Sequence, residues 1–234
     1  MYEREYMKKY LIAILIMFLS VNSAFSMEQI IEANQIQTRI DDIGMNILNN
    51  NKIPKRVVFV YDKRAKKKAL ATDKTLTKRQ VIIYDDLYQS IQTDDELAGV
   101  LSREIATAIK TYDGKNGSIT TIQIMLGAKK FETYADQRAV DYIVKAGYNP
   151  LALIIHINKV YPQKKFDKFS RHNLTSRRLA RIYEYITYKY PKYLKDNEFV
   201  NDKYYQNFLL TSLKNRKMLN DKIIEKSNKE LKYE

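Results

Sequence analysis

Residues 93–107 read Thr-Asp-Asp-Glu-Leu-Ala-Gly-Val-Leu-Ser-Arg-Glu-Ile-Ala-Thr, and this stretch decides the fold. Thr93 and Glu96 have the spacing of a capping box, in which the threonine oxygen accepts a bond from the amide three residues on. Apolar residues follow at helical spacing, so the sequence predicts a helix with one buried face. That face is formed by Leu97, Val100, Leu101, Ala108 and Ile109.

Three polar side chains lie along the second half of this predicted helix. Arg103 and Thr107 are four residues apart and therefore share one face, with Glu104 one step round. We expect the helix to end near Tyr112, because Asp113–Ser118 has the composition of a turn. The three polar positions are the first candidates for a functional site.

Short β-branched and aromatic segments precede the helix. Arg56–Tyr61 and Gln80–Tyr84 are rich in Val, Ile and Tyr, and Lys68–Thr72 is a shorter extended stretch. A lysine-dense turn, Arg64–Lys68, joins the first segment to the short one. We therefore predict a small antiparallel sheet.

Helical periodicity dominates the rest of the chain. Gly147 is typical of the residue just after a helix, Asn149 and Pro150 of a helix start, and Pro191 of a helix end. The fold class is therefore α+β and mostly helical. The predicted helices outside the central one are Ile30–Leu48, Ile122–Lys145, Leu151–Val160 and Thr175–Tyr190.

The N-terminal residues have the composition of an export signal. Lys8 and Lys9 precede the apolar stretch Leu11–Leu19, and small residues allow cleavage after Ser26. The apolar stretch is short for a bilayer span, although an uncleaved signal anchor remains the alternative. We expect export to the periplasm or the medium. The predicted organisation is a signal peptide at 1–26, a domain at 27–194 and an exposed, polar, helical appendage at 195–234.

The chain is strongly basic, with a formal net charge of +14. Lys52–Arg79 and Lys159–Lys195 each hold eleven Lys or Arg residues against two acidic ones. After an export signal, such stretches favour an anionic membrane surface or an envelope polyanion as partner, and no nucleic acid is expected. A solvated basic surface without a partner is the alternative. The absence of cysteine excludes both disulfides and a lipid-modified cysteine anchor.

Four short segments between Ala69 and Arg178 occur in an order that is typical of one enzyme family. They are Ala69–Thr72, Asp94–Leu101, Glu132–Asp136 with Ala139-Val140 and Ala146–Pro150 after it, and His172–Arg178. Together they resemble the zinc metallopeptidase family that includes HtpX, BepA and the CAAX prenyl endopeptidases. The resemblance implies a zincin-like peptidase domain, with the small sheet packed on the metal-site helices.

The resemblance also implies roles for single residues. In this family two histidines four residues apart and a glutamate from a later helix hold zinc, and a glutamate inside the motif is the general base. Glu104 stands at the general-base position and Glu132 at the position of the third ligand. Asp136, His172 and Arg178 stand at positions that support the metal ligands from outside.

Both histidine positions hold other residues, Arg103 and Thr107. Arginine has no lone pair for a metal, and a threonine hydroxyl is a poor zinc ligand. The proline that follows the downstream histidine in the family is also replaced, by Asn173. We therefore expect no zinc cofactor and no zinc-dependent peptidase activity.

Arg103 has two interpretations. Its guanidinium could fill the zinc position and pair with Glu132, which would hold two helices together without metal. Alternatively, Arg103 could be exposed with a local partner. The remaining histidine, His156, is interpreted as a hydrogen-bonded histidine within a helix.

Three functions remain open from the sequence. The first is an exported pseudopeptidase that binds polypeptide or envelope partners, with an extended chain held in the cleft or added at the strand edge Val81–Tyr84. The second is an active endopeptidase with unusual metal ligands. The third is a protein that binds anionic membranes or polyanions through Lys52–Arg79 and Lys159–Lys195.

Overall fold

A computed structural model describes most of the chain after its N-terminal segment, and the described ranges are 30–54, 57–64, 71–72, 80–111, 127–161 and 174–234. The predicted export signal, the turn Asp113–Ser118, His172 and Asn173 lie outside these ranges, as does most of Lys52–Arg79. The chain divides into two units, Met1–Arg39 and Ile40–Glu234. The candidate site belongs to the second unit, as do the buried hydrophobic residues of the described ranges with the exception of Ile36.

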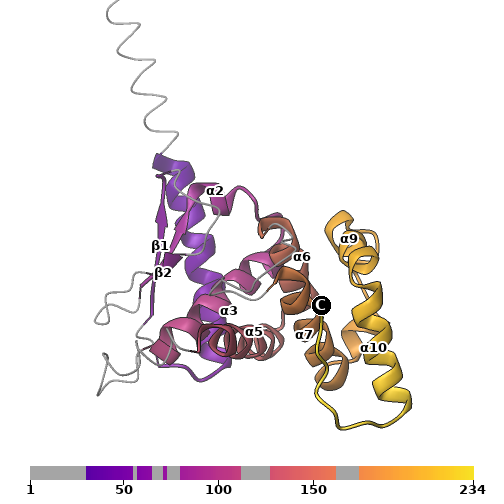
Figure 1. The fold of residues 1–234 in the computed structure, drawn as a ribbon. Helices are drawn as coiled ribbons and strands as arrows, with labels where there is room; N and C mark the ends of the chain where they lie inside the picture. Colours follow the sequence, from indigo (N-terminus) through magenta and orange to yellow (C-terminus); the bar gives the residue numbers. More distant parts are fainter. Residues whose placement is uncertain (1–29, 55–56, 65–70, 73–79, 112–126, 162–173) are drawn as a thin grey trace, which may run out of the picture. The chain divides into compact units, whose positions relative to one another are not determined.

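Most of the described residues are helical, and three short strands form one sheet (Figure 1), so the predicted α+β class is confirmed. A helix covers residues 30–50. None of the described helices is long and apolar enough to cross a membrane. The other elements are β1 (Val58–Asp62), β2 (Ala71–Thr72), β3 (Gln80–Tyr84), α2 (Asp85–Tyr88), α3 (Asp94–Thr111), α5 (Ala128–Lys145), α6 (Leu151–Val160), α7 (Thr175–Lys189), α8 (Lys192–Lys195), α9 (Lys203–Thr211) and α10 (Leu213–Ile224).

The sheet differs from the predicted antiparallel one. Its strand order is β1-β3-β2, with β3 parallel to β1 and antiparallel to β2. The strand that is last in sequence is central because its inward residues, Val81 and Ile83, are fully buried. The prediction joined neighbours in sequence, whereas burial of the most apolar strand sets the pairing.

This strand order also corrects the predicted site of peptide addition. All five residues of β3 pair with β1, from Gln80 opposite Val58 to Tyr84 opposite Asp62. On the other side of β3, Val81 and Ile82 pair with β2. Strand addition needs an unpaired edge, and Val81–Tyr84 lies in the central strand, so the prediction of an edge there was wrong.

Most of the predicted helix boundaries agree with the observed ones, but α5 begins at Ala128, after Gly127, whereas the prediction started this helix at Ile122. α3, α6 and α7 begin and end within one residue of the predicted limits. α5 ends in a Schellman motif: Gly147 has a φ of 88°, its N–H donates to Val144, and the N–H of Tyr148 donates to Ile143. At the start of α6, the Asn149 side chain accepts from the N–H of Leu151 at 3.0 Å.

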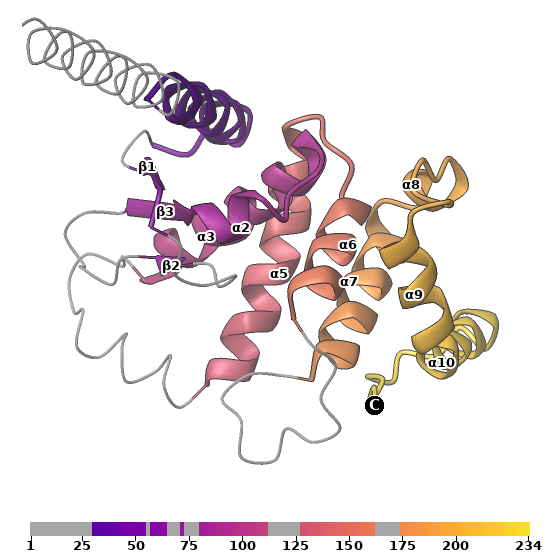
Figure 2. The same cartoon turned by 90° about the horizontal axis from the view of Figure 1, so that it is seen from above.

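The helices pack around α6, which is apolar on all sides and almost wholly buried. α3 contacts α5 and α6, and α7 contacts the same two helices (Figure 2). β3 packs on α3, so the sheet lies against the helix that carries Arg103. This arrangement brings residues from three separate sequence segments toward one point.

The C-terminal segment is more deeply buried than we predicted. Residues 195–234 were expected to be an exposed appendage, and they do form the helices α9 and α10. However, α9 packs against α6, and Tyr205 and Phe208 lie in the same core cluster as Leu153 and Ile186. A segment of polar composition can still supply a few large anchors to a core, and Phe208 is such an anchor.

Candidate functional site

The start of α3 sets the position of the candidate site. Thr93 Oγ1 accepts from the N–H of Glu96 at 3.2 Å, which is one half of the predicted capping box. The carboxylate of Glu96 instead pairs with Lys159 of α6, with 2.7 Å between Nζ and Oε2. This buried ion pair fixes α3 against α6, and Arg103 and Glu104 follow about two turns later.

Asp136 of α5 is the centre of a buried charge cluster. Arg178 of α7 binds it with two hydrogen bonds, from Nε to Oδ2 at 3.0 Å and from Nη2 to Oδ1 at 2.9 Å. Arg103 of α3 donates from Nε to Oδ1 of the same carboxylate at 3.1 Å. Asp136 therefore links three helices, and its bidentate contact with Arg178 is the strongest geometry for such a pair.

Two glutamates complete the cluster. Arg103 Nη1 donates to Glu104 Oε1 at 2.9 Å, and Arg178 Nη1 lies 3.5 Å from Glu132 Oε1. The side chains of Glu104 and Glu132 are 3% and 5% exposed. We call Arg103, Glu104, Glu132, Asp136 and Arg178 the charge cluster. It contains three carboxylates and two guanidinium groups.

The cluster contains five of the seven residues that the sequence singled out. Thr107 is close in the chain, but its hydroxyl donates to the carbonyl of Arg103 in its own helix at 3.0 Å. His172 lies outside the described residues. Arg103 is 15% exposed, so the interpretation of an exposed arginine was wrong. Its buried guanidinium does join two helices, although its partner on α5 is Asp136 rather than Glu132.

Both guanidinium groups stay charged at every accessible pH. Burial by itself lowers the pKa of Arg103, but the carboxylates of Asp136 and Glu104 more than offset this, and the net pKa lies above the usual value. At Arg178, burial likewise lowers the pKa and the Asp136 carboxylate raises it. The net pKa of Arg178 is also raised. The two guanidinium groups are therefore fixed positive charges at physiological pH.

Two further residues lie beside the cluster: Tyr161, which the sequence reasoning missed, and His156, which it interpreted as a hydrogen-bonded histidine. The guanidinium carbon of Arg178 lies 5.1 Å from the ring centroid of Tyr161, a cation–π distance. His156 of α6 is 1% exposed, and neither of its ring nitrogens has a hydrogen-bond partner among the described residues. The helical position predicted for His156 is therefore confirmed, but the prediction of a hydrogen bond was wrong for the described residues. Only its apolar neighbours in the sequence signalled its burial.

The residues present do not fit a zinc ion. The Arg103 guanidinium bonds the carboxylates of Glu104 and Asp136, and it has no lone pair to offer a metal. Within the described part of the chain, no group of three or more His, Cys, Asp or Glu side chains is arranged to hold a metal. The side chains of the cluster bind one another and hold α3, α5 and α7 together.

The second basic stretch, Lys159–Lys195, is not one surface. Lys159 is 8% exposed and pairs with Glu96, and Arg178 belongs to the charge cluster. Other cations of the stretch, on α7 and α8, face outward. A count of lysines and arginines along the sequence therefore overstates the charge that a partner could reach.

No protein-family model matches the chain, and no curated protein or solved structure is significantly similar to it.

Proposed function

We propose that the protein is a metal-independent binding protein for polypeptides, built on a zincin-like peptidase frame whose zinc has been replaced by arginine. The observation that carries the proposal is the contact of Arg103 with both Glu104 and Asp136. These three residues stand where the resemblance places a zinc ligand, the general base and a supporting carboxylate. With export, expected from the N-terminal segment, the partners would be envelope polypeptides.

The charge balance of the cluster supports this replacement. Three buried carboxylates repel one another unless cations lie between them, and a zinc ion would supply two positive charges. Arg103 supplies one positive charge in a position where it bonds Glu104 and Asp136. Arg178, at a position that the resemblance assigns to a supporting residue, bonds Asp136 and lies 3.5 Å from Glu132. A buried ion network of this kind holds its elements in place once formed, because loss of one partner leaves a charge uncompensated.

The test is to rebuild the metal site. The variant Arg103→His/Thr107→His restores two imidazoles four residues apart, beside Glu132. The measurements are zinc content after incubation and desalting, and the thermal midpoint with and without zinc. We expect no stoichiometric zinc in the wild type and about one zinc per chain in the double variant. Zinc should raise the midpoint of the double variant alone, because only its folded state would bind the ion.

Two controls make the result specific. Adding Glu132→Gln to the double variant removes the predicted third ligand and should weaken zinc binding by more than roughly tenfold. The single variant Arg103→His lacks the second imidazole and should bind weakly. Stoichiometric zinc in the wild type would overturn the proposal in favour of an active metallopeptidase. A folded double variant without zinc affinity would instead contradict the zincin-like frame.

A further inference from the structure

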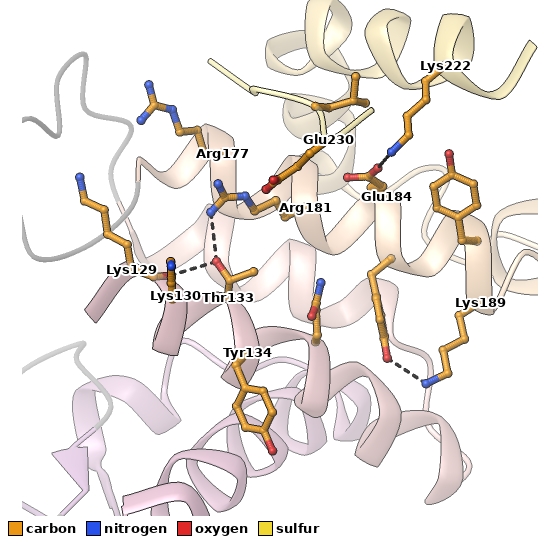
Figure 3. A pocket seen from close by; sticks show the side chains of 14 residues that line it. Lys129, Lys130, Thr133, Tyr134, Arg177, Arg181, Glu184, Lys189, Lys222 and Glu230 are labelled. Carbon is orange, nitrogen blue, oxygen red and sulfur yellow. Dashed lines mark hydrogen bonds and ion pairs between the residues drawn. The ribbon is translucent and has the colours of Figure 1, made fainter. Parts of the chain in front are cut away.

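A pocket of about 1040 Å³ lies between α5, α7, α10 and the C-terminal segment (Figure 3). Its lining includes none of the charge-cluster residues. In Figure 3, Lys129 and Arg177 lie at one end, Lys189 and Lys222 toward the other, and Arg181 between them. The basic residues of the lining are Lys129, Lys130, Arg177, Arg181, Lys189 and Lys222.

The pocket carries an excess of positive charge. Six lining side chains are basic and two, Glu184 and Glu230, are acidic. One of the six, Lys189, also pairs with Asp141 at 2.7 Å, so the excess is smaller than the count of lining residues. Cations around a concave surface reinforce one another, because the low-dielectric walls focus their field into the cavity. The charge therefore favours a ligand with negative groups.

Several of these cations are held in defined positions. Arg181 Nη1 donates to Thr133 Oγ1 at 3.0 Å, which links α7 to α5 across the pocket. Lys222 of α10 pairs with Glu184 of α7 at 2.9 Å. These contacts make the pocket a preformed feature of the fold, and a preformed site loses less entropy when it binds.

The lining favours a polypeptide over a uniform polyanion. Glu184 and Glu230 would repel a chain that carried negative charge at every unit, whereas a peptide can place neutral residues beside them. Tyr134 and Tyr188 are 39% and 54% exposed and offer rings for stacking. A lipid bilayer presents a broad surface, and its plane does not match charges that line a concavity.

The chain itself already shows an extended segment bound at this place. Residues 227–234 have no helix or strand, and Leu231 lines the pocket. Arg177 Nε donates to the carbonyl of Tyr233 at 2.8 Å, and Asn215 exchanges two hydrogen bonds of 3.1 Å with the backbone of Glu234. Tyr233 is 4% exposed. A main chain held by side-chain bonds, with a buried tyrosine, indicates that this surface accommodates a polypeptide segment. The segment itself is charge-balanced, with Lys229 and Lys232 against Glu230 and Glu234, so the preference for an acidic ligand is argued from the basic lining of the pocket.

We propose that the pocket binds an extended, acidic, tyrosine-containing polypeptide segment alongside the C-terminal residues. The proposal rests on the polypeptide-binding function proposed above, and it supplies both a site and a ligand class. Carboxylates of the ligand would pair with the cations at the end that holds Lys129 and Lys130, because Lys189 and Lys222 at the other end pair with Asp141 and Glu184. Its tyrosines would stack on Tyr134 and Tyr188.

The experiment measures binding of a fluorescein-labelled peptide of alternating Glu and Tyr residues by fluorescence anisotropy. The test variant is Lys129→Ser/Lys130→Ser. The matched control is Lys192→Ser/Lys195→Ser, which removes the same charge from α8, outside the pocket lining. We expect about tenfold weaker binding by the test variant, and less than twofold by the control, because two favourable charge contacts are lost only in the first.

A second peptide tests the specificity of binding, and a second variant is used if the first does not fold. A peptide of alternating Lys and Tyr should not bind. Tyr188→Ser, at an exposed position, should weaken binding severalfold and serves if the lysine variant does not fold. The proposal is overturned if the wild type does not bind, or if test and control variants lose affinity equally. It is also overturned if phosphatidylserine vesicles bind through Lys129 and Lys130 while the peptide does not.

The measurement is made with EDTA present, so it does not depend on any metal. If the wild type binds neither the peptide nor zinc, the proposal of a peptide-binding pocket is rejected. The proposal that arginine replaces zinc in the charge cluster is then retained. Zinc in the wild type, with peptide binding intact, would reject the pseudopeptidase and retain the pocket.

Discussion

Asp136 accepts hydrogen bonds from arginines on two different helices, so one side chain determines how α3, α5 and α7 meet. A buried ion pair is often no more stabilising than a well-packed apolar pair, and its value lies in geometry. Here the geometry is restrictive, because each guanidinium must reach carboxylates on two sides. The cluster therefore favours one arrangement of these three helices.

A second residue, His156, makes the free energy of unfolding depend on pH. Burial, followed by the positive charges of Lys159, Arg103 and Arg178, lowers its pKa from 6.5 to about 3. Between these values the unfolded chain binds a proton that the folded chain excludes. The free energy of unfolding therefore falls as the pH falls from about 6.5 toward 3, and above 6.5 the histidine contributes no pH dependence.

The variant His156→Leu removes this pH-dependent contribution to the free energy of unfolding and places an apolar side chain of comparable size at the position. We expect the free energy of unfolding of the variant minus that of the wild type to be about 3 kcal/mol larger at pH 4 than at pH 7. Urea unfolding at several pH values measures the difference. From pH 7 to 8 the difference should be constant, which serves as the control. A difference that stays constant down to pH 4 would show that folded His156 binds a proton readily.

At the scale of elements, substitution by alanine is expected to have opposite effects on stability at two helical glycines. A Cβ on Gly44 would overlap the ring of Phe59 on β1, and that ring is buried. A Cβ on Gly99 of α3 would lie 3.5 Å from the Leu153 Cα, an ordinary contact. Alanine favours a helix over glycine by about 1 kcal/mol at both sites, and only at Gly44 does overpacking of about 1–3 kcal/mol oppose it.

Gly44→Ala should therefore lower the free energy of unfolding by up to about 2 kcal/mol, and Gly99→Ala should leave it unchanged or raise it by up to about 1 kcal/mol. Urea denaturation of both variants beside the wild type measures these changes. Phe59→Leu should rescue Gly44→Ala in part, because it removes ring atoms from the overlap. Equal effects of the two glycine substitutions would contradict the close approach of this helix to β1.

The elements were largely predictable because helix signals are local. The period of α7 and the glycine after α5 lie within a few residues of the structures that they determine. The sheet was not predictable in the same way. Whether β1 pairs with β2 or β3 depends on which strand buries more apolar surface, and that depends on helices much later in the chain.

The candidate site was likewise predictable only in part. The resemblance picked out the positions from Arg103 to Arg178 that meet in space, because motif order reflects helix order. It did not identify which guanidinium pairs with which carboxylate. A long arginine side chain can reach more than one residue of a facing helix, so Asp136 and Glu132 were equally accessible from sequence alone.

For the whole molecule, the contribution of the C-terminal helices decides whether residues 40–234 unfold as one unit. α9 presents polar residues to solvent, but its Tyr205 and Phe208 contact the core that α6 and α7 form. Ion pairs such as Lys222 with Glu184 add further links between α10 and α7. Segments that share one core normally unfold in one transition, whereas an appendage would unfold separately.

Phe208→Ala tests this cooperativity, with Leu210→Ala on the same helix as the control. Phe208 is 0% exposed and Leu210 is 77% exposed. Deleting a buried aromatic ring costs about 3–5 kcal/mol, and truncating an exposed leucine changes stability by less than about 0.5 kcal/mol. Urea unfolding is followed by far-ultraviolet circular dichroism and by tyrosine fluorescence, since the chain has no tryptophan. We expect Phe208→Ala to shift one common transition in both signals. A second transition that alone responds to Phe208→Ala would mean that the C-terminal helices fold independently of the frame that holds the charge cluster.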